Sequence, residues 1–241
     1  GEDLIFPHHE NEIAQSEAAN GKEFSRYWMH NGFLNIDNRK MSKSLGNFFT
    51  VREISEKYDL QVLRFFMLSA HYRSPLNFSA ELMEAAKSGL ERIITAAERL
   101  KFLMGSAKTE DMAETEAEKF AKSAEYVGNF ESAMDDDFNT ADAIAAVFDL
   151  VKFINTMTDE DSSKEYLENL FDRLVRLTEV LGIIVDKEDE ILDSDIEALI
   201  AERQAARKEK NFARADEIRD ELLAKGIILK DTREGVKWKR A

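Results

Sequence analysis

The stretch SAELMEAAKSGLERIITAAERL, residues 79–100, decides the fold class of this chain. Ser79 is a residue type that caps helix N-termini, and Gly105 is expected to end the helix that follows. Apolar side chains recur at intervals of three and four, as on one face of an α-helix; they are Leu82, Ala86, Leu90, Ile93, Ala97 and Leu100. The pattern predicts one long amphipathic helix.

Three more helices are predicted after the acidic segment 107–119, which is expected to be a loop or a helix start. They span residues 117–135, 140–157 and 164–181, and Met134 and Met157 are expected in the core. The middle helix carries an inward stripe of Ile144, Val147, Phe148, Val151 and Ile154. Long helices with short connections form antiparallel bundles, so residues 79–185 are predicted to be a helix bundle.

The segments on either side of the bundle have shorter periodic patterns. Before it, a helix is expected at 9–20 and strand-like pieces at 28–35. Short helices are then expected at 50–58, with Thr50 as cap, and at 60–70, which make residues 50–78 a connector. After the acidic linker 186–195 come two helices at 196–209 and 213–225, and a hairpin pairing 227–230 with 236–239. Residues 186–241 are therefore a small α+β module in a mainly α protein.

Composition limits the class of protein. A chain of 241 residues with 44% hydrophobic content can bury a core. The sequence contains no apolar run of about 18 residues and no signal peptide, and it has no cysteine for a disulfide. We therefore expect a cytoplasmic chain without a membrane anchor.

The net charge of −15 is unexpected for a protein that binds nucleic acid, because Lys and Arg normally neutralise phosphates. The charge is unevenly distributed. Residues 202–241 contain 12 Lys and Arg against 8 Asp and Glu, so the rest of the chain carries −19. The tail is either a basic island suited to RNA or a solvated helix face with mixed charges.

The loop KMSKS, residues 40–44, places two lysines and two hydroxyls between Gly32 and Gly46. Lysine ammonium groups act on phosphates as point charges, and serine hydroxyls add hydrogen bonds. When pyrophosphate leaves an activated nucleotide, negative charge builds up on the leaving oxygens. Cations placed beside those oxygens stabilise the transition state of the reaction. Taken alone, the segment is either a phosphate clamp or a solvated basic turn.

His8 and Glu12 lie one helical turn apart, so an imidazole and a carboxylate can converge on a cation. Zinc sites in proteins use three or four protein ligands, and the chain has no cysteine to add. The pair alone is either part of a metal site or a feature of a helix start.

Several motifs in order resemble the cysteinyl-tRNA synthetase family of class I aminoacyl-tRNA synthetases. They are DLIFPHHENEIAQS (3–16), YWMHNGFL (27–34), KMSKS (40–44), DDDFNT (135–140), and AARK (205–208), ADEIR (215–219) and GIILKD (226–231) in the tail. The resemblance implies that residues 1–49 are the end of a Rossmann-type catalytic domain. It also implies that the bundle is a tRNA-binding domain of the DALR type and that the module 186–241 binds the anticodon.

In that family a zinc ion held by two cysteines, a histidine and a glutamate binds the substrate thiolate, and His8 and Glu12 match the last two ligands. The family's HIGH-type motif and its two cysteines have no match here, so we expect a C-terminal half with an incomplete zinc site. Direct coordination of the substrate thiolate by zinc discriminates cysteine from serine more sharply than a hydrophobic pocket does. By the same resemblance, Lys43, Lys40 and Ser42 hold the phosphates of ATP with magnesium.

The positions that match the family's anticodon-contacting pattern are Arg207, Asp216 and Asp231, with Phe212 as a stacking surface. Unpaired bases expose edges for hydrogen bonds and faces for stacking, which suits these residue types. Simpler roles are also open, because Asp216 can pair with Arg214 or Arg219 and Phe212 can belong to the core.

The resemblance predicts an ATP-dependent ligase that joins cysteine to tRNA-Cys, acting as a monomer and represented here by a fragment that is inactive alone. Two alternatives remain. The fragment can be a tRNA-binding module without catalysis, or the chain can derive from a related cysteine ligase of small-thiol biosynthesis, which needs no anticodon module.

Overall fold

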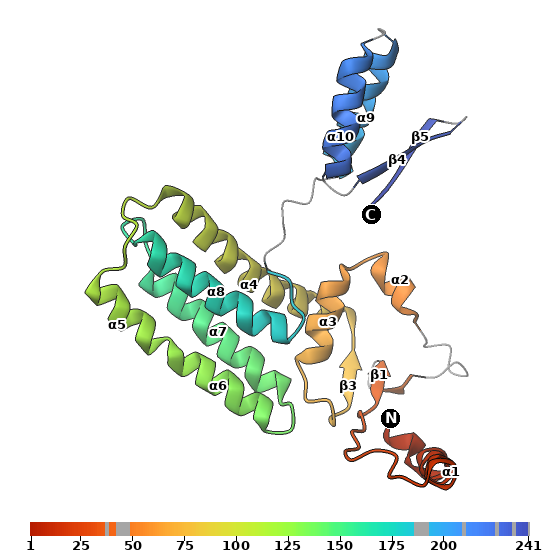
Figure 1. The fold of residues 1–241 in the computed structure, drawn as a ribbon. Coiled ribbons are helices and arrows are strands. Elements are labelled where there is room, and N and C mark those ends of the chain that lie inside the picture. The colour runs from red at the N-terminus through yellow and green to blue at the C-terminus, as the bar shows by residue number, and fades with distance from the viewer. Residues whose placement is uncertain are drawn as a thin grey trace. The chain divides into compact units, whose positions relative to one another are not determined.

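The computed structural model describes residues 1–36, 39–41, 49–185, 193–208, 211–224, 227–232 and 235–240. The chain divides into two compact units, Gly1–Asp186 and Lys187–Ala241, and each has its own hydrophobic core. Helices dominate both units (Figure 1). The mainly α class predicted from the periodicity is thus confirmed.

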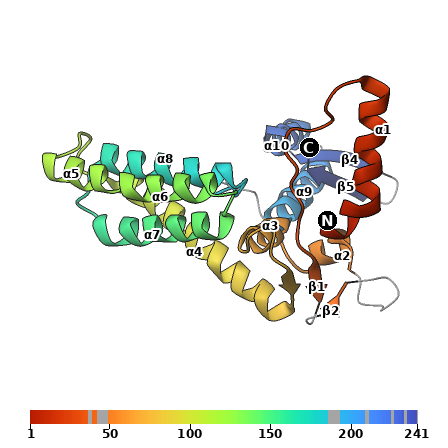
Figure 2. The ribbon, with the colours of Figure 1, turned by 90° about the horizontal axis from the view of Figure 1, so that it is seen from below.

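The larger unit is built around five helices: α4 (Ala80–Ser106), α5 (Glu114–Lys122), α6 (Ala124–Asp135), α7 (Thr140–Met157) and α8 (Lys164–Val180). Helix α4 packs on α7 and α8, α6 packs on α7, and α5 packs on α8. Two perpendicular views show α6, α7 and α8 side by side (Figure 2). The core of the larger unit contains fully buried side chains from α4, α7 and α8: Met83, Ile93, Leu100, Leu150, Ile154, Leu167, Leu170 and Leu174.

Side-chain caps fix where α4 and α7 begin. The Ser79 hydroxyl accepts a hydrogen bond from the Leu82 amide at 3.2 Å, as the sequence predicts. The Asn139 side chain accepts from the Asp142 amide at 3.2 Å and starts α7 at the predicted residue, Thr140. Gly105 does not end α4, which continues to Ser106.

Three core predictions need correction. Leu82 is 42% exposed because it lies beside the buried stripe in the first turn of α4, and its neighbour Met83 is fully buried instead. Met157 is 37% exposed at the end of α7, where the bundle no longer covers it. Phe148 is only half-buried.

The helix predicted at 117–135 is two helices that meet at Ser123. Arg173 of α8 explains the break, because its guanidinium donates to the Ser123 hydroxyl and to the Phe120 carbonyl. The segment 107–119, expected to be a loop or a helix start, becomes helical at Glu114. The Glu116 carboxylate accepts hydrogen bonds from the Ser163 amide at 2.9 Å and hydroxyl at 2.6 Å, which fixes α5 to the start of α8.

The N-terminal segment begins with a 3₁₀ turn (Glu2–Leu4) and a π-helical turn (Ile5–His9), followed by α1 (Glu10–Asn20), none of whose residues is buried. A small sheet has the order β2-β1-β3, formed by β1 (Leu34–Ile36), β2 (Arg39–Lys40) and β3 (Leu76–Phe78). Strand β1 is antiparallel to β2 and parallel to β3. The strand predicted at 28–35 is therefore mostly irregular, because the chain enters the sheet only at Leu34, opposite Leu76.

Two short helices connect this sheet to the bundle: α2 (Val51–Ser55) and α3 (Leu60–Leu68). A capping box between Thr50 and Glu53 starts α2, which confirms Thr50 as a cap, although α2 and α3 end earlier than predicted. Helix α3 packs on α4, and its Arg64 Nε donates to the Leu181 carbonyl at 2.7 Å. This bond ties α3 to the chain that leaves α8.

The smaller unit pairs α9 (Asp193–Lys208) with α10 (Phe212–Ala224) and adds the antiparallel hairpin of β4 (Ile227–Thr232) and β5 (Gly235–Arg240). Its core contains Ile200, Ile218, Leu222 and Ile227. The two helices and the hairpin predicted from the sequence are confirmed. Helix α9 begins at Asp193, three residues before the predicted start.

The left-handed backbone at Gly182 gives a test of the junction between α3 and α8. Its φ is 65°, and a Cβ there overlaps the Arg64 guanidinium, so Gly182→Ala is expected to lower the free energy of unfolding by roughly 1–3 kcal/mol. Gly128→Ala is the matched control: Gly128 lies inside α6 with open space around it, and the change should raise stability by roughly 0.5–1 kcal/mol. Urea unfolding of the full chain measures both. Equal effects of the two changes would contradict this account.

Candidate functional site

The N-terminal histidines lie around an aromatic cluster. His9 Nδ1 and His30 Nε2 are 3.0 Å apart, and the His9 ring also stacks on the His30 ring at 5.0 Å. The Trp28 ring lies 5.9 Å from that of His9 and is nearly parallel to that of His30. This cluster fixes the loop 28–30 against the start of α1.

His8 and Glu12 stand outside this cluster, and both are exposed. They occupy the end of the π-helical turn and the first turn of α1, one helical turn apart as predicted. The described residues contain no group of three or more side chains able to hold a metal ion. Their nitrogen and oxygen donors are of the type zinc accepts, but two ligands are too few for a zinc site.

The lysine loop starts from the edge of the small sheet. Lys40 lies in β2 opposite Asn35 of β1, and the Met41 amide donates to the Leu34 carbonyl at 3.3 Å. Ser42 and Lys43 lie outside the described residues. The start of the loop is thus held by β1, which is itself held by β3.

The clearest ionic cluster joins that sheet to the bundle through Asp137, in the turn between α6 and α7. The Asp137 carboxylate accepts from the Tyr72 hydroxyl at 2.7 Å, from Arg73 Nε at 2.5 Å and from Arg73 Nη2 at 3.2 Å. The His71 ring nitrogen lies 3.7 Å away. We call these four residues the Asp137 clasp. Hydrogen bonds lower the pKa of Asp137 below its ordinary value; the one from Arg73 has the larger effect and the one from Tyr72 the smaller.

Backbone geometry brings the parts of the clasp together. Asp137 and Phe138 both have a φ of 55°, a conformation that turns the chain sharply between the two helices. On the other side, the Gly32 amide donates to the Tyr72 carbonyl at 2.8 Å, and a Cβ at Gly32 would lie 2.6 Å from the Ser74 carbonyl carbon. Only glycine therefore allows segment 30–36 to pack against segment 71–78.

Sequence reasoning did not identify His71, Tyr72 and Arg73 as a functional group. The one available signal was the run of three acidic residues that ends at Asp137, because such a run in a tight turn favours a cationic partner. The partner lies 64 residues away, so no local pattern reveals it.

In the smaller unit, Arg207 is exposed near the end of α9, and Phe212 begins α10 with 59% of its surface exposed. The alternative that Phe212 belongs to the core is therefore wrong. Asp216 is exposed one helical turn after Phe212, on the same side of α10. Arg214 instead binds Glu202 at 2.9 Å and Glu217 at 2.7 Å.

Asp231 lies in β4 opposite Val236, and its side chain is outside the described part. The structure thus brings Phe212 and Asp216 together on one face of α10.

Across the described ranges, no helix is long and apolar enough to cross a membrane.

Comparison with known proteins first defines the class. Residues 1–88 match the model of the class I (C) tRNA synthetase catalytic domain, and residues 129–185 match the DALR domain. The crystal structure of the ternary complex of Agrobacterium radiobacter K84 agnB2 LeuRS-tRNA-LeuAMS has a similar fold, with a TM-score of 0.61 and 18% identity. That similarity covers 78% of this chain and 27% of the other. The fold is that of a class I aminoacyl-tRNA synthetase.

The particular family follows from the tail and from whole-chain similarity. Residues 189–238 match the cysteinyl-tRNA ligase anticodon binding domain. The chain is 68% identical to cysteine–tRNA ligase of Lachnospira eligens and 58% identical to that of Lachnoclostridium phytofermentans, with 100% of this chain and 51% and 52% of those proteins covered. The chain belongs to the cysteine–tRNA ligase family and spans about half the length of the curated relatives it matches.

The Asp137 clasp predicts a pH-dependent contribution to stability. Because the folded pKa of Asp137 is lowered, its contribution is complete above the unfolded pKa of about 3.9 and is lost as the pH falls through the folded pKa. The stability difference between wild type and Asp137→Asn should therefore be largest near neutral pH and shrink below about pH 4. Asparagine tolerates positive φ, so the change reports on the carboxylate.

Urea unfolding between pH 3 and pH 7 measures this difference. Asp149→Asn, at an exposed position of α7, is the control for the same loss of charge. A difference between wild type and Asp137→Asn that stays constant over the whole range, or that matches the control, would refute the clasp.

Proposed function

We propose that the chain is part of an enzyme that activates cysteine with ATP and transfers it to tRNA-Cys, and that this part binds the tRNA. The observation that carries the proposal is the anticodon-domain match at 189–238 within a chain that is 68% identical to a cysteine–tRNA ligase over all its residues. We further propose that the enzyme is a cytoplasmic monomer.

In this proposal α10 presents Phe212 to stack on an unpaired base and Asp216 to hydrogen-bond the edge of a base. Arg207 and Asp231 contribute from α9 and β4. The exposed aromatic ring and a carboxylate four residues later support this role, because splayed bases offer both a face and hydrogen-bonding edges.

For the chemical step, Lys43, Lys40 and Ser42 hold the phosphates of ATP with its magnesium. The position of the loop supports this role, because β2 places its first lysine at the sheet edge. His8 and Glu12 supply two zinc ligands, and the remaining ligands come from outside these 241 residues. Zinc, when bound, favours the deprotonated thiol of the substrate cysteine.

Of the two alternatives, a ligase of small-thiol biosynthesis is disfavoured, because such an enzyme needs no anticodon module and residues 189–238 match one. The other alternative, a tRNA-binding module without catalysis, describes the expected behaviour of this chain when it is tested alone.

The anticodon proposal predicts selective binding of tRNA-Cys. The full chain should bind a tRNA-Cys transcript more tightly than the same transcript with a substituted anticodon, as measured by filter binding. Phe212→Ala should weaken binding of the cognate transcript by about 1–3 kcal/mol through the loss of stacking. Leu223→Ala, which truncates another exposed apolar residue of α10, is the control. Equal affinity of wild type for both transcripts would count against anticodon recognition.

The chain alone is expected not to form cysteinyl adenylate. Cysteine-dependent ATP–pyrophosphate exchange should stay at background, because only two zinc ligands and one of the two nucleotide motifs are present. A full-length relative serves as the positive control. Robust exchange by this chain, or a stoichiometric tetrahedral zinc site in it, would overturn this expectation.

A further inference from the structure

Helix α3 is only nine residues long, yet it contacts two parts of the larger unit that serve different steps of the proposed function. On one side, the Phe66 ring packs edge-on against the Phe78 ring of β3, with 5.7 Å between the ring centroids. Strand β3 pairs with β1, which holds the start of the lysine loop. On the other side, α3 binds the chain that leaves α8 and leads in sequence to the smaller unit.

Two side chains of α3 bind the backbone of residues 181–185, which we call the exit segment. Arg64 Nε donates to the Leu181 carbonyl at 2.7 Å, and the Gln61 side-chain oxygen accepts from the Ile184 amide at 3.3 Å. Residues three apart on a helix lie on the same face, so both bonds act from one side of α3. The exit segment is therefore held at two points.

Packing also fixes the exit segment. The Ile183 amide donates to the Thr178 carbonyl at 2.9 Å, which closes the end of α8. Ile184 is 53% exposed, and the alternate side chains are buried in the core of the larger unit: Leu181, Ile183 and Val185. The hydrogen bonds from α3 thus act on a backbone whose side chains already alternate between core and solvent.

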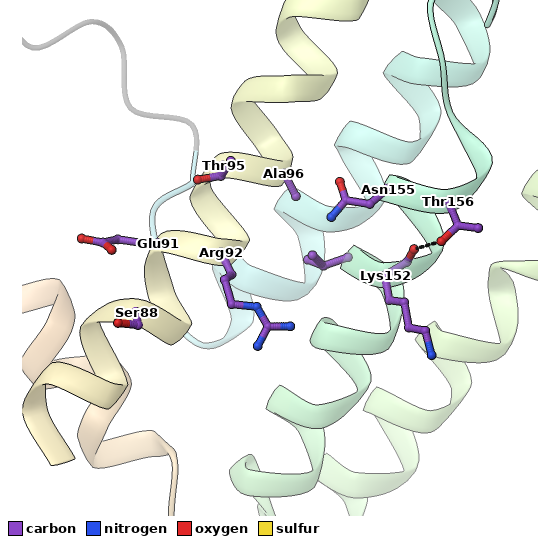
Figure 3. Close-up of a pocket in the computed structure, with 9 residues that line it drawn as sticks. Ser88, Glu91, Arg92, Thr95, Ala96, Lys152, Asn155 and Thr156 are labelled. Atoms are coloured by element: carbon purple, nitrogen blue, oxygen red, sulfur yellow. Dashed lines mark hydrogen bonds between the residues drawn. The ribbon is translucent and has the colours of Figure 1, made fainter. Parts of the chain in front are cut away.

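The close approach of Arg64 depends on glycine at position 182. A Cβ there would lie 2.6 Å from the Arg64 Cζ, so a larger residue would displace the guanidinium. Arg92 of α4 is used differently. It reaches toward α7 (Figure 3), where its guanidinium lies over the Phe148 ring, 4.9 Å from the ring centroid. The guanidinium of Arg64 instead holds a backbone carbonyl of the exit segment.

We propose that Arg64 and Gln61 are positioning residues for the charging of tRNA, because they fix the direction in which the chain leaves the larger unit. This inference rests on the function proposed above, in which the lysine loop serves the reaction with cysteine while the smaller unit binds the anticodon. A ligand that contacts two linked parts of a protein gains from both only when the link lets the two contacts form together. Arg64 and Gln61 contact neither the RNA nor the cysteine.

The test compares three activities of the full-length enzyme that contains this chain. Arg64→Ala and Gly182→Ala should each lower kcat/KM for the aminoacylation of tRNA-Cys by about tenfold, because the tRNA is held less well for the reaction. Cysteine-dependent ATP–pyrophosphate exchange does not involve the tRNA and should keep the wild-type rate. Binding of an RNA hairpin with the anticodon stem and loop of tRNA-Cys should also stay unchanged, because the smaller unit is intact.

Gly182→Ala changes no charge, so the same loss in both variants excludes a direct contact between Arg64 and a phosphate. Gly128→Ala, inside α6, is the matched control and should charge tRNA-Cys as the wild type does. Gln61→Ala should give a smaller loss, because its hydrogen bond to the exit segment is longer. Hydrogen exchange of the peptide 181–185 should be faster in all three variants of the contact, which shows that they release the exit segment.

The proposal fails if Arg64→Ala and Gly182→Ala charge tRNA-Cys at the wild-type rate, or if only Arg64→Ala loses activity. It also fails if pyrophosphate exchange falls as much as charging does, since that result indicates damage to the catalytic domain, or if hydrogen exchange of the exit segment is unchanged. In each of these cases the proposed function stands, because the wild type still charges tRNA-Cys. A wild-type enzyme that does not charge tRNA-Cys would contradict the proposed function and this inference with it.

Discussion

The carboxylate of Asp137 is the ionic contact that joins the turn between α6 and α7 to the segment before β3 in the larger unit. It accepts hydrogen bonds from Tyr72 and Arg73, so the turn between α6 and α7 is held to the segment that leads into β3. Strand β3 pairs with β1, and β1 holds the start of the lysine loop. This ionic group thus links the bundle to the sheet from which the lysine loop starts, and the strained φ values at Asp137 and Phe138 serve that link.

The helices of the bundle could be predicted from the sequence because the signals that define them are local. Apolar spacing and capping residues such as Ser79 and Thr50 act within one or two helical turns, and the helices they predict are present. The errors have long-range causes. The break at Ser123 is set by Arg173, some 50 residues later in the chain, and the burial of Met83 in place of Leu82 is set by packing against other helices. Periodicity contains neither interaction.

The candidate sites show the same division. The spacing of His8 and Glu12 fixes their separation on a helical turn, but it could not reveal that His9 contacts His30 across 21 residues. The exposure of Phe212 follows from its place at the start of α10, outside the stripe that packs on α9, whereas sequence alone left a core role open. The motifs identified the candidate residues, but the contacts that those residues make depend on the fold.

The acidic character of the chain has a physical consequence for any RNA that it binds. A net charge of −15 repels phosphates over the distance of a Debye length, so sequence-independent attraction to nucleic acid is weak. Binding then depends on short-range contacts where cations are free of carboxylates, and the folded chain neutralises cations such as Arg73, Lys108 and Arg176 within itself. For the tRNA binding proposed above, this arrangement favours specificity, because an RNA that cannot reach the exposed face of α10 experiences mainly repulsion.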